Sequence, residues 1–137
     1  MIPHLSIGTQ RDVGILLVDD QPAVRQGLRL LLQLEPAAAV IGEAGTGTEA
    51  LALARDLKPD VVFMDIAMPG MDGIETMALL VAMLPQVAVI ILTMYGTSDT
   101  RARALAAGAR AFVEKGRPEE VEVAFRQVSD SLRLRMG

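Results

Sequence analysis

The stretch VGILLVDD, residues 13–20, is a run of apolar and small residues that ends in two aspartates. A strand buried on both faces has such a continuous apolar pattern, whereas a half-exposed strand alternates apolar and polar residues. Similar runs lie at 39–43, 61–64, 87–92 and 111–113. The sequence therefore predicts five strands, each buried on both faces.

Segments with apolar residues at helical spacing separate and follow these runs, at 22–34, 49–57, 74–84, 99–107 and 118–132. Residues typical of helix ends accompany them, namely the pairs Thr46/Glu49 and Asp72/Glu75, Gly108 and Pro118. Five alternations of strand and helix, joined by right-handed crossovers, predict an α/β fold. The expected architecture is a doubly wound (βα)5 parallel sheet with helices on both faces, and ligands should bind beyond the carboxyl ends of its strands.

The 137 residues suit one domain, and the absence of cysteine excludes disulfides and thiolate metal sites, which fits a cytoplasmic protein. A net charge of −4 argues against direct nucleic acid binding. We expect residues 1–11 to be a flexible leader without a signal peptide. Residues 76–98 lack charge, but Pro85 divides them, so we predict two buried elements and no membrane span.

Acidic side chains end two of the predicted strands. Asp19 and Asp20 follow the first strand and Asp65 follows the third. If these strands are neighbours, the carboxylates converge and repel one another, and a divalent cation would relieve that repulsion. Ligand oxygens without histidine or cysteine favour Mg²⁺ over Zn²⁺. The alternative for Asp19 and Asp20 is that they only cap the following helix.

The loop DIAMPGMDG, residues 65–73, connects the third strand to the next helix. It resembles the phosphoacceptor loop of response-regulator receiver domains, in which an aspartate leaves its strand and Met-Pro and Met-Asp-Gly follow. Asp19 and Asp20 before the loop, and Thr93 and Lys115 after it, extend the resemblance over residues 13 to about 132. We therefore expect residues 12–135 to form a receiver domain with the strand order 2-1-3-4-5.

The resemblance implies a role for each of these positions. Asp65 would accept a phosphoryl group from a sensor histidine kinase or a phosphotransfer protein. Asp19, Asp20, Asp65 and the backbone carbonyl of Ala67 would hold Mg²⁺. Lys115 and Thr93 would contact oxygens of the phosphoryl group, and Thr93 with Phe112 would switch the conformation of the face formed by 99–107, 111–113 and 118–132. That face, or the first and last predicted helices, is a candidate homodimer surface.

Each residue also has a simpler interpretation when taken alone. A lysine at a strand end is usually solvated, a threonine there usually belongs to a turn, and a phenylalanine usually belongs to the core. Two other functions stay open: an aspartate-nucleophile phosphatase, and a binding module that works without phosphorylation. The first would usually carry a second acid two residues after the nucleophile, where Ala67 stands. We otherwise expect no enzyme activity beyond the domain's own phosphorylation and dephosphorylation.

Two features separate this chain from many receivers. Gly116 follows Lys115 where proline is common, and because a cis bond without proline costs about 2.5–4 kcal/mol, we predict a trans bond or a local rearrangement. The segments LTMY (92–95) and GARAF (108–112) resemble receivers of the NarL/LuxR type, which precede a helix-turn-helix DNA-binding domain. We expect no such output domain within this chain, so DNA binding would need another domain.

Overall fold

The computed structural model describes residues 12–68, 70, 72–94 and 96–136, with side chains described up to residue 132. The leader expected at 1–11 lies outside these residues, as do Pro69 and Met71 of the 65–73 loop. Strands and helices alternate, in the order β1 Val13–Val18, α2 Pro22–Leu32, β2 Ala38–Ala44, α3 Gly47–Leu57, β3 Val61–Met64, α4 Gly73–Met83, β4 Ala88–Thr93, α5 Ser98–Ala106, β5 Ala111–Glu114 and α6 Pro118–Met136.

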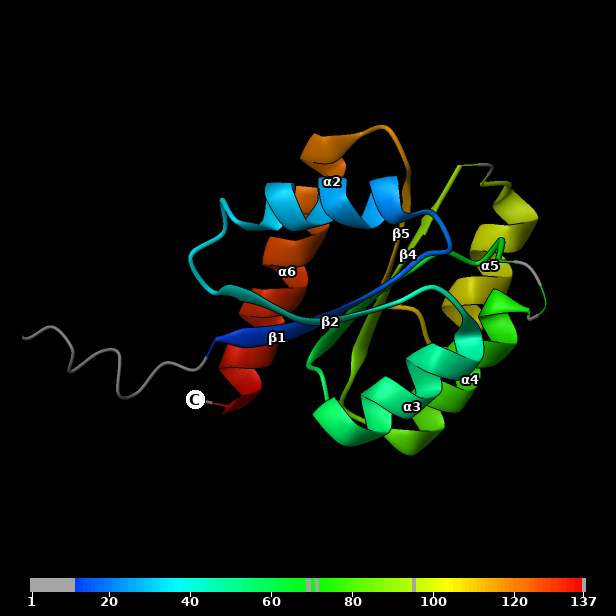
Figure 1. Ribbon diagram of the computed structural model, residues 1–137, viewed down its shortest axis with the longest axis horizontal. Coiled ribbons are helices and arrows are strands. Elements are labelled where there is room, and N and C mark those ends of the chain that lie inside the picture. The colour runs from blue at the N-terminus through cyan, green and yellow to red at the C-terminus, as the bar shows by residue number, and fades with distance from the viewer. Residues whose placement is uncertain (1–11, 69, 71, 95, 137) are drawn as a thin grey trace, which may run out of the picture.

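The five strands form one parallel sheet in the order β2-β1-β3-β4-β5. This confirms the predicted α/β fold and the strand order 2-1-3-4-5. Helices α2 and α6 cover one face of the sheet, and α3, α4 and α5 cover the other (Figure 1). Because β1 leads outward to β2 on one side and β3 leads to β4 on the other, the order of the strands reverses between β1 and β3, where such folds bind their ligands.

Alternate residues of the central strands enter two separate cores. Ile15 and Phe63 face α2 and α6, and the Phe63 ring packs against Phe125 of α6 at 6.4 Å between centroids. Leu16 and Met64 face the other helices and are fully buried there. Continuous apolar strands are therefore required, since each residue of β1 and β3 has a helix above it or below it.

Most predicted boundaries are correct to within one or two residues. The Thr46 hydroxyl accepts the Glu49 amide at 3.1 Å, so α3 begins at Gly47 instead of 49. Asp72 accepts the amides of Ile74 and Glu75 in the same way at the start of α4. The first helix ends at Leu32 instead of 34, because the chain makes tight turns there. The largest difference is at the last helix, which was predicted to end at 132 and continues to Met136.

Two further predictions concern the uncharged stretch 76–98 and the peptide bond between Lys115 and Gly116. The uncharged stretch 76–98 is divided between α4 and β4, as expected, and none of the helices in the described part of the chain is both long and apolar enough to cross a membrane. The Lys115–Gly116 peptide bond is trans, and Gly116 has a φ of +90°. Glycine adopts that angle readily, so the chain turns after β5 without a cis bond.

Candidate functional site

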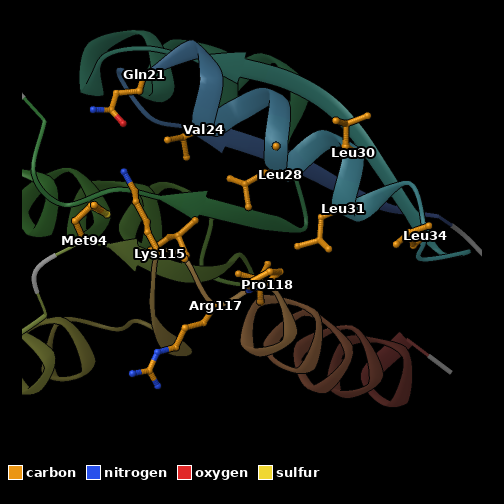
Figure 2. Close-up of a pocket in the computed structure, with 14 residues that line it drawn as sticks. Gln21, Val24, Leu28, Leu30, Leu31, Leu34, Met94, Lys115, Arg117 and Pro118 are labelled. Atoms are coloured by element: carbon orange, nitrogen blue, oxygen red, sulfur yellow. The ribbon is translucent and has the colours of Figure 1, made fainter.

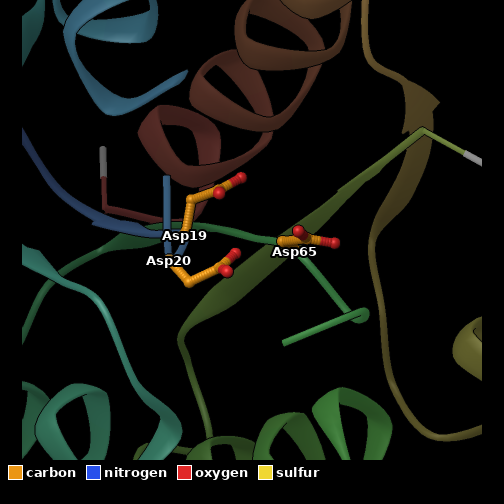
Figure 3. A group of neighbouring side chains, drawn as sticks. All are labelled: Asp19, Asp20 and Asp65. Atoms are coloured by element: carbon orange, nitrogen blue, oxygen red, sulfur yellow. The ribbon is translucent and has the colours of Figure 1, made fainter. Parts of the chain in front are cut away.

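Three carboxylates meet beyond the carboxyl ends of β1 and β3. Val18 and Met64 are paired in adjacent strands, so the residues that follow them, Asp19 and Asp65, start from neighbouring backbone positions. One carboxylate oxygen from each of Asp19, Asp20 and Asp65 lies within 4.8 Å of the others. Figure 3 shows the three side chains gathered at this edge of the sheet. Asp19 and Asp65 are buried and Asp20 is exposed, so the group opens to solvent on one side.

Lys115 joins two of these carboxylates. Its Nζ lies 2.7 Å from Asp19 Oδ2 and 3.0 Å from Asp65 Oδ2, and its side chain is only 9% exposed. The backbone amide of Lys115 donates to the carbonyl of Thr93 at 2.8 Å, which fixes where the lysine leaves β5. The interpretation of Lys115 as a solvated surface charge is therefore wrong.

The electrostatic environment keeps Lys115 charged. Burial favours the neutral amine and by itself would lower the pKa of Lys115, but hydrogen bonds to Asp19 and Asp65 and the charges of both carboxylates outweigh it, so the pKa is raised above its ordinary value. The ammonium neutralises only part of the acidic group, which keeps an excess of negative charge. An oxygen-rich, partly open group of this kind suits a hard divalent cation, and the residues therefore fit Mg²⁺.

The loop after β3 holds Asp65 in place. Asp65 Oδ1 accepts the backbone amide of Ala67 at 2.9 Å, and the Asp65 amide donates to the carbonyl of Val18 at 3.0 Å. Gly73, at the start of α4, packs directly on the backbone of Ile66, where an added Cβ would lie 2.3 Å from the Ile66 Cα. Both carboxylate oxygens of Asp65 are thus engaged, one by the loop and one by Lys115. The role of the Ala67 carbonyl as a metal ligand stays a prediction.

Thr93 and Phe112 lie on the next two strands. Thr93 ends β4, is 2% exposed and pairs with Glu114, the residue before Lys115. Phe112 is half-buried on β5, with its ring against Gly96 and the guanidinium carbon of Arg101 5.8 Å from the ring centroid. An added Cβ on Gly96 would lie 3.5 Å from the Thr93 methyl and 2.7 Å from the Phe112 ring. The structure therefore brings Thr93 and Phe112 next to the same glycine.

Sequence patterns did not reveal a groove between α2 and the segment that joins β5 to α6, which we call the α2–α6 groove. It has a volume of about 660 Å³, and Lys115 and Met94 lie at one end while Leu34 lies at the other (Figure 2). Leu30 and Leu34 are 58% and 70% exposed. The segment 22–34 contains more leucines than one buried helix face can hold, and this surplus was the signal in the sequence that could have revealed the groove.

A second feature that the sequence analysis missed is a set of ion pairs behind the acidic group. Arg25 and Arg29 of α2 both contact Glu43 of β2, at 2.8 Å and 2.6 Å. Arg25 also donates from Nη1 to the backbone carbonyl of Asp19. The spacing of Arg25 and Arg29 places both on one side of a helix, but nothing in the sequence identifies Glu43 as their partner.

Comparison with known proteins gives a consistent result. A family model described as the response regulator receiver domain matches residues 15–125. The uncharacterized transcriptional regulatory protein YhcZ of Bacillus subtilis is 40% identical over 114 residues, which are 83% of this chain and 53% of that protein. The chain thus spans about half the length of the curated relatives it matches.

Solved structures agree in both sequence and fold. A two-component response regulator of the LuxR family from Aurantimonas sp. SI85-9A1 is 36% identical with a TM-score of 0.81, over 85% of this chain and 84% of that one. The signal receiver domain of the putative response regulator NarL from Mycobacterium tuberculosis is 32% identical with a TM-score of 0.78, over 87% of this chain and 98% of that one. These similarities confirm the expected resemblance to receivers of the NarL/LuxR type.

Proposed function

The chain belongs to the response regulator receiver domain family, and we propose that it accepts a phosphoryl group on Asp65. Membership of this two-component family implies that a histidine kinase is its partner. The observation that carries the proposal is the position of Lys115, whose ammonium joins Asp19 to Asp65 while Asp20 completes the acidic group. A buried lysine held between two carboxylates is ready to contact a new anion that forms on one of them.

The chemistry is a displacement at phosphorus. A carboxylate oxygen of Asp65 attacks the phosphorus of a phosphohistidine, the new O–P bond forms as the N–P bond breaks, and the imidazole nitrogen leaves with the electron pair. Bound by Asp19, Asp20, Asp65 and the Ala67 carbonyl, Mg²⁺ would neutralise charge on the transferred group. Lys115 then donates to one phosphoryl oxygen and the Thr93 hydroxyl donates to another.

Phosphorylation would act as a switch because it replaces the single charge of the Asp65 carboxylate by a phosphoryl group with about two negative charges and three acceptor oxygens. Thr93 and Lys115 can contact these oxygens in only one arrangement of their loops. Thr93 would move toward Asp65, and Phe112, which shares Gly96 with it, would change its packing. The population then shifts toward a second arrangement of α5, β5 and α6. This surface, or that of α2 and α6, would be the contact in a homodimer.

The α2–α6 groove is the docking surface that we propose for the phosphohistidine donor. The donor must bring its imidazole to Asp65, and the groove ends at Lys115, which contacts Asp65 directly. The exposed Leu30 and Leu34 would pack against an apolar face of the donor. A Leu30→Ser, Leu34→Ser variant should therefore lose transfer from a kinase while it keeps phosphorylation by acetyl phosphate.

We also propose bounds and a cellular location for the domain. Residues 12–135 would be the receiver unit and 1–11 a flexible leader, and the unit would work in the cytoplasm, where ATP supplies the kinase. Catalysis would be limited to its own phosphorylation and dephosphorylation. Because a net charge of −4 disfavours direct contact with nucleic acid, an effect on DNA would depend on another domain.

The test is intact-mass spectrometry after incubation with acetyl phosphate and Mg²⁺. We expect wild type to gain the mass of one phosphoryl group and Asp65→Asn to gain none. Asp130→Asn, which removes an exposed carboxylate from α6, is the matched control and should react like wild type. Removal of Mg²⁺ with EDTA should slow the reaction at least about a hundredfold, since metal neutralisation of charge in phosphoryl transfer supplies several kcal/mol. An unchanged mass gain in Asp65→Asn would refute the proposal.

A further inference from the structure

Arg25 connects the acidic group to the edge of the sheet. Its side chain is 18% exposed, and its Nε donates to Glu43 Oε1 at 2.8 Å while its Nη1 donates to the backbone carbonyl of Asp19. Arginine is suited to such a double contact, because its guanidinium is planar and presents several donors in fixed directions. The two contacts therefore link the backbone carbonyl of Asp19, just after β1, to the carboxylate of Glu43, near the end of β2.

Glu43 is itself held firmly. Its second oxygen, Oε2, accepts from Nε and Nη2 of Arg29 at 2.9 Å and 2.6 Å. Hydrogen bonds from Arg29 and Arg25 lower the pKa of Glu43 below its ordinary value, so the carboxylate stays charged to a lower pH than an ordinary glutamate. Arg25 bonds the other oxygen, Oε1, so its anchor on Glu43 does not require Arg29 and keeps its Nη1 near the Asp19 carbonyl.

The Asp19 carbonyl matters because it belongs to the peptide group that carries Asp20. That group is planar, so the Asp19 carbonyl, the amide of Asp20 and the Asp20 Cα share one plane. The other polar groups of Asp19 are also bound: its amide donates to Ala44, its Oδ1 accepts from Gln21 and its Oδ2 contacts Lys115. Among the polar groups of Asp19, the carbonyl is bound by a side chain of α2, that of Arg25. Its orientation sets the direction in which the chain continues to Asp20.

We propose that Arg25 is a positioning residue that orients the Asp19–Asp20 peptide and thereby sets the affinity of the acidic group for a divalent cation. This inference rests on the proposed function, in which Asp19, Asp20 and Asp65 hold Mg²⁺. Asp20 is the exposed member of the group and has least support from its own surroundings, so its carboxylate depends most on the backbone that carries it. Groups that orient metal ligands from behind typically change metal affinity by about 10- to 100-fold when they are removed.

The competing view is that Arg25 only fastens α2 to β2 through Glu43. Arg29 separates the two views, because it lies on the same helix and binds the same carboxylate, yet its hydrogen bonds to Glu43 do not involve Asp19. Loss of Arg29 removes an ion pair of the same kind and leaves both contacts of Arg25 in place. It is therefore the matched control for Arg25.

The experiment is Mg²⁺ titration by isothermal calorimetry with wild type, Arg25→Gln and Arg29→Gln. We expect Arg25→Gln to weaken Mg²⁺ binding about tenfold, at the lower end of the range for such supporting groups. The Mg²⁺ affinity of Arg29→Gln should stay within about twofold of that of wild type, because Arg29 does not contact a residue of the acidic group. With acetyl phosphate, Arg25→Gln should need more Mg²⁺ for half-maximal phosphorylation but approach the wild-type rate when Mg²⁺ saturates, which a purely structural role would not produce.

Arg25→Lys provides a second variant if Arg25→Gln does not fold. A lysine can keep the ion pair with Glu43 but cannot fork to the Asp19 carbonyl, so it should fold and still bind Mg²⁺ more weakly than wild type. Equal Mg²⁺ affinity of wild type and the folded Arg25 variants would overturn the inference while the proposed function stands. Failure of wild type to bind Mg²⁺ or to be phosphorylated would instead overturn the proposed function.

Discussion

Two glycines show how differently the two halves of the site are built. Gly73 supports the acceptor half, which we define as Asp19, Asp20, Lys115 and residues 65–67, and a Cβ added to it would meet the backbone of Ile66. Gly96 belongs to the switch edge, which we define as Thr93, Gly96, Arg101 and Phe112, and its nearest neighbour is the ring of Phe112. Backbone cannot move aside without shifting the loop to which it belongs, whereas a partly exposed ring can turn. The comparison indicates an acceptor half that is formed in advance and a switch edge that can repack.

The largest effect should follow from Gly73→Ala. Its Cβ would lie 2.3 Å from the Ile66 Cα and 2.7 Å from the Ile66 carbonyl oxygen, so the acceptor loop must shift. We expect a loss of about 4 kcal/mol in the free energy of unfolding, at the upper end for single substitutions. Urea denaturation measures this loss. Gly27→Ala in α2, where the new Cβ would meet nothing within 4 Å beyond the helix's own nearby backbone, should be neutral or stabilising.

Lys115→Met tests the electrostatic part of the acceptor half. The buried carboxylates of Asp19 and Asp65 would face each other without the ammonium, and removal of one partner from a buried ion pair typically costs about 3 kcal/mol. Mg²⁺ should recover part of this loss, because it would supply the missing positive charge. Denaturation with and without Mg²⁺ measures the recovery, and Lys58→Met at an exposed position should show no Mg²⁺ dependence beyond that of wild type.

Gly96→Ala examines the switch edge with the same substitution. The new Cβ would lie 2.7 Å and 3.2 Å from two atoms of the Phe112 ring, which can turn away. We expect a smaller loss, about 1 kcal/mol, together with changed aromatic NMR signals of Phe112 and retained phosphorylation on Asp65. A loss as large as that of Gly73→Ala would mean that the switch edge is as rigid as the acceptor half.

The smallest effect concerns pH. The pKa of Glu43 is lowered by Arg29 and Arg25, so its contribution to stability is present at pH values above its ordinary pKa and disappears as the pH falls through the lowered value. Glu43→Gln should therefore reduce stability at neutral pH and make little difference at the acid end. Thermal unfolding of both proteins from neutral to strongly acidic pH measures this. A difference that stays constant over the whole range would contradict the assignment to Glu43.

The sequence was sufficient for the fold and for the members of the acidic group. Asp19, Asp65 and Lys115 end parallel strands, and because parallel strands end at the same edge of a sheet, their convergence follows from strand order alone. The contact between Arg25 and Asp19 could not be predicted, since it depends on how α2 is rotated above the sheet. The closeness of Gly73 to Ile66 depends in the same way on the path of the loop.

Amide hydrogen exchange before and after phosphorylation tests the contrast between the two halves most directly. We predict that phosphorylation of Asp65 changes exchange mainly in α5 and β5, around Arg101 and Phe112, and leaves the start of α2 around Arg25 and the start of α4 around Gly73 nearly unchanged. Larger changes at Arg25 and Gly73 than at Arg101 and Phe112 would contradict a preformed acceptor half beside a switch edge that repacks.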